Sequence, residues 1–344
     1  MKLYDDKGYL NFREIRDRGY PYNIVIGGRG TGKTFGALQT SVEDELPFMF
    51  MRRLQNEADI IKAPDFSPIR PVCRATGWKI KAVPVVKGIG GFARYELNDE
   101  GKEVVLGQPL GYICALSTIG KVRGFDSARV KILIYDEFLP EKGSRVLKNE
   151  YDILMNAYET LNRNRELEGQ KPLQLFCLAN ANDLASPVLL RLNLVKRLDT
   201  MIKKGTQIWT DDKRGILLCV LQDSPISTAK ASTALYRLTE GSDYAGMALS
   251  NNFAYEERGR IASRPLGEYK PVVTVGELTV YVHKSRREFY CTTHRSGSCP
   301  RYDTGDHSLE RFRQAYGWLW KEAMTDNIEY EEYLCQALLL RYIG

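Results

Sequence analysis

The sequence predicts an α/β fold, with a parallel sheet that helices cover on both faces. Three nearly continuous apolar runs, at residues 23–26, 131–135 and 173–178, indicate strands buried on both sides. Stretches compatible with helices follow the first two runs, and strands that alternate with helices form parallel sheets. The 344 residues leave room for two or three domains.

The first apolar run leads into a glycine-rich turn with the spacing G-x-x-x-x-G-K-[ST]. The turn consists of Gly27, Gly28, Arg29, Gly30, Thr31, Gly32, Lys33 and Thr34. Its glycines let the backbone curl tightly, so that N–H groups and the positive end of the next helix face phosphate oxygens. Lys33 would reach the β- and γ-phosphates, and Thr34 would offer its hydroxyl to Mg²⁺. A glycine turn with a chance lysine is the alternative, but the flanking strand and helix favour a site for a nucleoside triphosphate and Mg²⁺.

The segments around this turn are predicted in less detail. Residues 1–21 mix aromatic and charged side chains, and we expect them to pack beside the nucleotide. The apolar run 47–51 predicts a second strand. Four prolines then punctuate a stretch that we expect to be rich in β-structure, namely Pro64, Pro68, Pro71 and Pro84. Its clearest part is a hairpin of residues 91–97 and 104–106, and residues 112–116 predict a further strand.

Two adjacent acids, Asp136 and Glu137, follow the buried run 131–135. In P-loop enzymes a carboxylate at this strand end holds Mg²⁺, directly or through water. A second carboxylate beside it can polarise the water that attacks the γ-phosphate. The pair therefore favours a hydrolase over a kinase. Solvated acids at a strand end are the alternative, which the upstream glycine-rich turn makes the weaker one.

Asn180 ends the third buried run, where a polar side chain can sense the γ-phosphate. A turn-forming asparagine explains the residue equally well, because residues 180–183 favour a turn. Both interpretations stay open from the residues alone.

Arginines end the helix that periodic apolar residues predict over 151–161. Arg163 could reach a γ-phosphate bound by a neighbouring subunit, as could Arg165. A helix end that simply favours cations explains them better, with Glu159 and Arg163 as an i,i+4 pair. Lys121 and Arg123, in a glycine-flanked loop, are open to the same two interpretations.

The chain changes character near residue 224. A compact helical connector is predicted over 225–256, and strands are predicted at 271–282 and 288–292. Helices are predicted at 309–324 and 329–342. The predicted domains are therefore 1–224, 225–256 and 257–344.

The amino-acid composition limits which binding partners and which cellular compartment we expect. The net charge of +6 allows a polyanionic partner, and residues 258–301 hold nine Lys and Arg against three Glu, a weak signal for phosphate binding. Seven scattered cysteines suggest reduced thiols, and we expect a cytoplasmic protein without membrane spans or a signal peptide. The spacing of Cys291, His294, Cys299 and His307 fits no common zinc finger, so zinc is the weaker interpretation.

Together these segments resemble the DNA encapsidation ATPases of small short-tailed bacteriophages, and the resemblance covers most of the chain in order. The likeness is strongest at residues 24–34 (IVIGGRGTGKT), 50–53 (FMRR), 134–138 (IYDEF), 159–166 (ETLNRNRE) and 177–181 (CLANA). The glycine-rich turn alone indicates only an NTPase. The Asp-Glu-Phe and Arg-Asn-Arg-Glu segments at this spacing are more specific.

The resemblance implies an additional-strand, RecA-like P-loop ATPase domain, a helical linker and an α+β, RNase H-like C-terminal domain that has lost nuclease activity. It implies an ATP-driven motor that moves double-stranded DNA into a prohead. The motor would be a homomeric ring of five subunits at the portal vertex in the host cytoplasm, with or without a packaging RNA.

The resemblance also implies roles for single residues. Lys33 and Thr34 would be Walker A residues, and Asn180 would belong to the nucleotide site. Asp136 would be the Mg²⁺ ligand and Glu137 the catalytic base. Arg163 would be an arginine finger acting in trans, with Lys121 as a second trans-acting cation. Asn162 departs from the family, which has a bulky apolar residue there, and the Cys/His segment has no counterpart.

Three rival functions remain from the sequence. A small-molecule kinase would need an acceptor pocket and a lid. A non-enzymatic docking role for the C-terminal third would place DNA contact elsewhere. An active nuclease is disfavoured, because Asp303, Asp306 and Glu310 do not form an evident catalytic cluster.

Overall fold

The computed structural model describes residues 2–344 except 122–127, 141–146, 148, 182–183, 185, 223, 240–259 and 326. The chain divides into two compact units. One comprises Met1–Asp183 and Met201–Phe253, and the other comprises Leu184–Thr200 and Ala254–Gly344. Each unit is described by itself.

The first unit is built on a nine-stranded sheet with the order β3-β4-β5-β2-β6-β7-β1-β9-β8. The strands are β1 (Tyr22–Gly27), β2 (Phe48–Arg52), β3 (Ile80–Val86), β4 (Ile89–Leu97), β5 (Glu103–Ala115), β6 (Ile132–Asp136), β7 (Gln174–Asn180), β8 (Ile208–Asp211) and β9 (Ile216–Leu221). The six strands from β5 to β9 in this order pair in parallel, whereas β3, β4 and β8 add antiparallel edges. The predicted α/β class is confirmed, with a mixed sheet.

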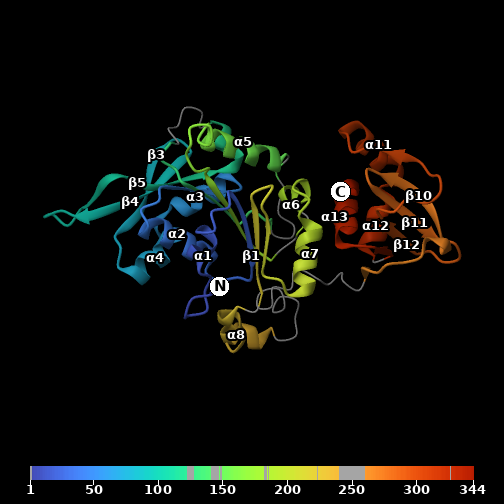
Figure 1. Ribbon diagram of the computed structural model, residues 1–344, viewed down its shortest axis with the longest axis horizontal. Coiled ribbons are helices and arrows are strands. Elements are labelled where there is room, and N and C mark those ends of the chain that lie inside the picture. Colours follow the sequence, from blue (N-terminus) through green and yellow to red (C-terminus); the bar gives the residue numbers. More distant parts are fainter. Residues whose placement is uncertain are drawn as a thin grey trace. The chain divides into compact units, whose positions relative to one another are not determined.

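Helices cover both faces of this sheet, as predicted (Figure 1). They are α1 (Phe12–Arg16), α2 (Lys33–Glu43), α3 (Gln55–Lys62), α4 (Ile69–Thr76) and α5 (Glu150–Asn162). Alternate strand residues such as Phe50, Ile134 and Phe176 pack in one core with residues of α1 to α4. On the other face, the ring of Tyr158 on α5 lies 5.0 Å from that of Tyr22.

The stretch after β2 differs from its prediction. Residues 55–76 are largely helical rather than β-rich, because α3, a short 3₁₀ helix (Pro64–Phe66) and α4 precede β3. Pro71 lies in the first turn of α4, where the backbone N–H has no helical partner, so proline is tolerated there. The 112–116 run is not a separate strand but the end of β5, which follows β4 in the predicted hairpin.

Two short helices, α8 (Pro225–Ala231) and α9 (Ala234–Leu238), follow β9 within the first unit. They agree with the helical character predicted after residue 224. The helices α6 (Pro187–Arg191) and α7 (Val195–Lys204) lie between β7 and β8 in the chain.

The second unit is an α+β fold with a five-stranded sheet of order β13-β10-β11-β12-β14. Its elements are β10 (Tyr269–Val275), β11 (Leu278–His283), β12 (Phe289–Thr292), β13 (Arg301–Tyr302), α11 (Asp306–Tyr316), α12 (Trp318–Met324), β14 (Ile328–Tyr330) and α13 (Tyr333–Ile343). The predicted strand 271–282 is a hairpin, because Gly276 turns the chain with a φ of +55°. The predicted helix 309–324 is interrupted at Gly317.

Within the described part of the chain, no helix combines the length and apolar composition that crossing a membrane requires.

Candidate functional site

The glycine-rich turn joins β1 directly to α2, as predicted. β1 ends at Gly27 and α2 begins at Lys33. Gly30 and Gly32 have φ values of +71° and +90°, a region that favours glycine. The turn can therefore close only with small residues at these positions, and it aims the N-terminus of α2 at whatever the turn encloses.

Lys33 is buried inside this turn. Its Nζ donates hydrogen bonds to the carbonyl oxygens of Gly27 and Gly28, at 2.9 and 2.8 Å. It also lies 3.3 Å from Thr31 Oγ1 and from Asn180 Oδ1. Burial lowers the pKa of Lys33 to about 7. A phosphate group close to Nζ would favour the charged form again.

The strand order brings the predicted site residues to one edge of the sheet. β7 lies between β1 and β6, and Gly27 pairs with Asn180 while Asp136 pairs with Leu178. Carboxyl ends of parallel strands meet at the same edge, where ligands of open α/β sheets bind. The strand that ends at Asn180 thus lies between the strands that end at Asp136 and at Gly27.

Thr34 and Asp136 meet at this edge. Thr34 Oγ1 donates a 2.9 Å hydrogen bond to Asp136 Oδ1. Burial raises the pKa of Asp136, which is only 2% exposed. Its other oxygen, Oδ2, is buried without a hydrogen-bond partner among the described residues, although the guanidinium of Arg52 lies 3.1 Å away. Hydroxyl and carboxylate oxygens are the donors that Mg²⁺ prefers, so these two side chains fit the ion.

Glu137 occupies the turn after β6. Its φ of +53° is unusual for a residue with a side chain, and the carboxylate is 57% exposed. The exposure leaves it accessible to water, as a general base requires. The geometry suits the predicted role, which stays a prediction.

Arg52 is a site residue that the sequence did not single out. It ends β2, and its guanidinium pairs with both Asp136 and Glu137. Its position follows from the strand pairing, because β2 pairs in parallel with β6 and Met51 lies beside Tyr135. The next residue along each strand must then be a neighbour of the other.

The two arginines after α5 differ in their surroundings. Arg163 is exposed and caps α5 with φ +50° and ψ −137°, a combination that normally requires glycine. Arg165 is buried, and its Nη2 donates to the carbonyl oxygens of Val130 and Ala128, at 2.6 and 3.3 Å. Arg165 therefore fixes the loop before β6, which leaves Arg163 as the candidate for reaching another molecule.

Asn162 replaces the expected apolar side chain for a structural reason. Its buried Oδ1 accepts a 2.8 Å hydrogen bond from the backbone N–H of Leu173, which ties the end of α5 to the approach to β7. Lys121 ends a 3₁₀ helix (Leu116–Lys121), but its side chain and the whole of Arg123 lie outside the described residues.

The N-terminal segment contacts the glycine-rich turn. The backbone N–H of Leu10 donates to the carbonyl of Thr31 at 2.8 Å, and a Cβ on Gly32 would lie 3.0 Å from Tyr9. From the other end of the unit, Lys230 on α8 donates to the carbonyl of Arg29 at 2.9 Å. The sequence offered no signal for Lys230, because roughly 200 residues separate it from the turn.

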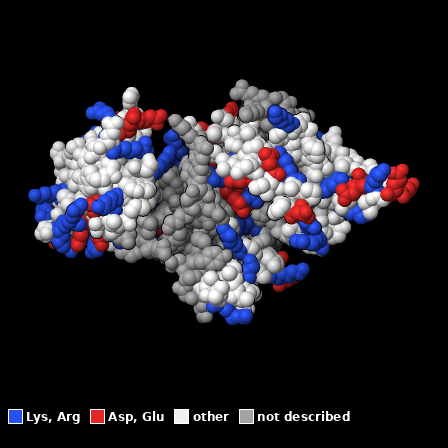
Figure 2. All heavy atoms as spheres, turned by 180° about the vertical axis from the view of Figure 1, so that it is seen from behind, with Lys and Arg blue, Asp and Glu red and all other residues white. Residues whose placement is uncertain are grey.

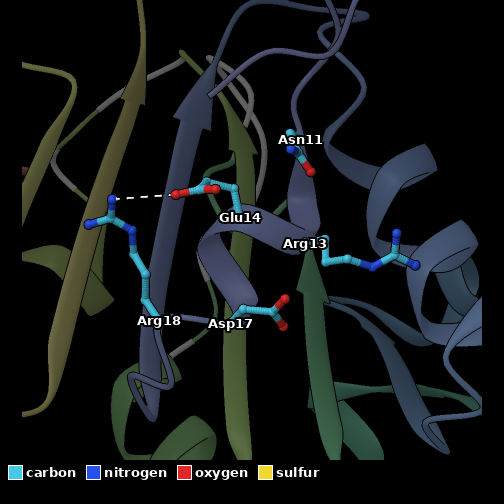
Figure 3. A pocket seen from close by; sticks show the side chains of 5 residues that line it. All are labelled: Asn11, Arg13, Glu14, Asp17 and Arg18. Carbon is cyan, nitrogen blue, oxygen red and sulfur yellow. Dashed lines mark ion pairs between the residues drawn. The ribbon is translucent and has the colours of Figure 1, made fainter. Parts of the chain in front are cut away.

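A hollow of about 380 Å³ lies apart from this site, on α1 (Figure 3). It is lined by Asn11, Arg13, Glu14, Asp17 and Arg18. Arg18 pairs with Glu14, whereas Arg13 points away from them and pairs with Asp44. The side chains do not converge on one point, so the sheet edge remains the candidate site.

The cysteines and histidines of the Cys/His segment lie in different environments within the second unit. Cys291 is fully buried in β12, whereas His294 is exposed and lies 3.1 Å from Glu331. The Sγ of Cys299 lies 3.4 Å from Thr274 Oγ1. Among the described residues, no group of three or more His, Cys, Asp or Glu is placed to hold a metal ion.

Comparison with known proteins identifies a family that this chain matches. The model of the family "Podovirus DNA encapsidation protein (Gp16)" matches residues 89–290, more than half of the chain. A DNA packaging protein of Bacillus phage phi29 is 25% identical over 248 residues, which are 70% of this chain and 65% of that protein. One of Bacillus phage B103 is 23% identical, over 79% of this chain and 77% of its own length. The alignment thus spans just under two thirds of the phi29 protein.

Two solved structures share the fold. "The Phi-28 gp11 DNA packaging Motor" matches with a TM-score of 0.62 and 17% identity, over 98% of both chains. "The bacteriophage Phi-29 viral genome packaging motor assembly" matches with a TM-score of 0.63 and 20% identity, over 98% of this chain and 99% of that one. At these identities the likeness establishes the architecture.

Proposed function

The chain belongs to the podovirus DNA encapsidation protein (Gp16) family, and on that premise we propose that it is an ATP-driven motor that translocates double-stranded viral DNA into a preformed prohead. The observation that carries the proposal is the meeting of Lys33, Thr34, Asp136 and Glu137 at one edge of the parallel sheet. The groups to which we assign phosphate binding, metal binding and water activation thereby lie within one site.

In the proposed reaction, the N–H groups of the glycine-rich turn and Lys33 bind the ATP phosphates. Thr34 and Asp136 would hold Mg²⁺, which would neutralise charge on the transferred phosphoryl group. Glu137 accepts the proton of the attacking water. Asn180, in hydrogen-bond reach of Lys33, would sense the γ-phosphate.

Arg163 and Lys121 complete the site of a neighbouring subunit in this proposal. Arg163 is exposed and held in an unusual backbone conformation, which is the kind of strain found at functional sites. A guanidinium supplied in trans stabilises transition-state charge. We therefore propose a homomeric ring of five subunits, docked at the prohead portal in the host cytoplasm, with or without a packaging RNA.

DNA contact in this proposal is mainly electrostatic. The basic segment 258–301 supplies nine Lys and Arg, but several already pair with acids, including Arg264 with Glu329 and Arg287 with Glu322. On the face drawn in Figure 2, the described basic and acidic side chains are interspersed. Contacts to phosphates carry no sequence information, so translocation should be sequence-tolerant and salt-sensitive.

The test of this proposal is ATP hydrolysis with and without duplex DNA, for single variants and for mixtures. Lys33→Ala and Arg163→Ala subunits should each be inactive alone and recover turnover when mixed, because each supplies what the other lacks. No recovery at any ratio would overturn action in trans. Turnover that ignores duplex DNA but consumes a small-molecule acceptor would overturn the motor itself.

A further inference from the structure

The helix α8 places a lysine directly on the phosphate-binding turn. Lys230 Nζ donates a 2.9 Å hydrogen bond to the carbonyl oxygen of Arg29. A Cβ added to Gly30 would lie 1.9 Å from the same Nζ. The absence of a side chain at Gly30 therefore makes room for Lys230 as well as for the turn itself.

The position of α8 is fixed by buried contacts. Ser224, which precedes α8, is fully buried, and its Oγ donates to the carbonyl oxygen of Gly8 at 3.1 Å. A Cβ on Gly8 would lie 2.8 Å from Pro225 Cβ and from the backbone nitrogen of Ile226, so the two segments are in close contact at Gly8. The backbone N–H of Leu10 also donates a hydrogen bond to the carbonyl oxygen of Thr31 in the glycine-rich turn. These contacts fix α8, and α8 in turn holds Lys230 beside the glycine-rich turn.

Lys230 and Lys33 share one electrostatic environment. Their ammonium groups take the carbonyl oxygens of three successive residues, Lys33 those of Gly27 and Gly28 and Lys230 that of Arg29. The positive charge of Lys230 also contributes to the lowered pKa of Lys33. Two cations that repel each other at one turn are both stabilised by an anion placed between or beside them.

We propose that Lys230 is a second phosphate-binding lysine of the same subunit, which contacts the terminal phosphates of a nucleoside triphosphate together with Lys33. The inference rests on the proposed function, because it assigns a further residue to that nucleotide site. Lys33 of this motif is placed to reach the β- and γ-phosphates, and Lys230 donates to the next carbonyl along the same loop. The contact makes α8 part of the nucleotide site although it follows the entire sheet in the chain.

The test is a calorimetric titration of the full-length protein with ATP, ADP and AMP in the presence of Mg²⁺, which measures the dissociation constant of each nucleotide. Lys230→Met should weaken ATP binding about tenfold, the size expected for one hydrogen bond to a charged group, with a smaller loss for ADP and none for AMP. Lys230→Arg should keep most of the affinity. Lys213→Met is the matched control, because Lys213 is exposed in the turn between β8 and β9, at the opposite edge of the sheet.

The outcomes separate the inference from the function beneath it. An unchanged ATP affinity of Lys230→Met, or an equal loss for all three nucleotides, would overturn the phosphate contact and leave Lys230 a structural tether of α8. Lys33→Ala serves as the reference in the same titration. If Lys33→Ala also binds ATP like the wild type, the proposed nucleotide site fails as a whole.

Discussion

Arg52 Nη2 lies 3.1 Å from Asp136 Oδ2, and the same guanidinium pairs with Glu137. One cation thus offsets the repulsion between two neighbouring carboxylates at the end of β6. Arg52→Ala should leave that repulsion uncompensated and misplace Glu137. We expect ATP turnover to fall about ten- to a hundredfold. The measurement is kcat beside the ATP dissociation constant, and an unchanged kcat would remove Arg52 from the site.

Glu137→Gln should abolish most hydrolysis while the protein still binds ATP, because glutamine cannot accept the proton of the attacking water. General-base removal typically costs about 10²- to 10⁴-fold in rate. Glu45→Gln is a matched control, since Glu45 is also exposed and has a φ of +51° but lies just beyond the far end of α2. Single-turnover kinetics decide the point, and equal losses in the two variants would contradict a catalytic role.

Arg163 and Arg165 should separate into a functional and a structural arginine. Arg163→Ala should lower turnover of the assembled protein with little change in stability. Arg165→Met should lower the free energy of unfolding by about 1–3 kcal/mol, because the carbonyls of Val130 and Ala128 lose their buried donor. Chemical denaturation beside ATPase assays measures both effects. The reverse assignment would follow if Arg163→Ala proved the less stable protein.

Arg53, Glu150 and Tyr135 form a buried polar cluster beneath the site. Arg53 lies 3.2 Å from Glu150, and the Tyr135 hydroxyl donates to the same carboxylate at 2.5 Å. Arg53→Met leaves the Glu150 charge buried without its cation and should cost about 3–5 kcal/mol. The double variant Arg53→Met, Glu150→Leu should recover part of this loss. Thermal denaturation checks the pair, and additive losses would show that the two residues are not coupled.

The second unit should lose stability in acid. A hydrogen bond from Asn327 and the charge of Arg287 hold the pKa of Glu322 below its ordinary value of 4.5. A lowered folded-state pKa contributes stability above the unfolded value, which is lost as the pH falls through the folded one. Amide protection factors of peptides from 306–344, corrected for the slower intrinsic exchange in acid, should therefore fall below about pH 4.5, and Glu322→Gln should flatten this dependence. A parallel pH profile in the variant would exclude Glu322 as the cause.

Sequence patterns predicted the core of the first unit because its strands are buried on both faces. Runs such as 131–135 and 173–178 have no polar face to confuse the pattern, and β6 and β7 lie where they were expected. The segment after β2 is predicted less well, since its prolines suggest interruptions, whereas Pro71 lies in the first turn of α4, where a helix tolerates proline. The sequence pattern does not separate β10 from β11, because the turn of this hairpin is short and carries a single glycine.

The site could be predicted where the motif is contiguous, as from Gly27 to Thr34. Asp136, Glu137 and Asn180 could be predicted because they follow or end buried strands, whereas residues without such a local pattern could not. Arg52 follows from strand pairing, once the order β2-β6 is known. Lys230 does not follow from any local pattern, because its contact with Arg29 depends on how α8 packs against the N-terminal segment.

Under the proposed role of Arg163, the stability of the end of α5 is set against activity. Its φ of +50° and ψ of −137° suit glycine, so Arg163→Gly should relieve strain at the end of α5 while it deletes the guanidinium. A library selected in the laboratory only for heat resistance would therefore favour glycine at this position. Such a variant should stay folded at higher temperature but lose ATP turnover, because the proposed role of Arg163 needs the guanidinium.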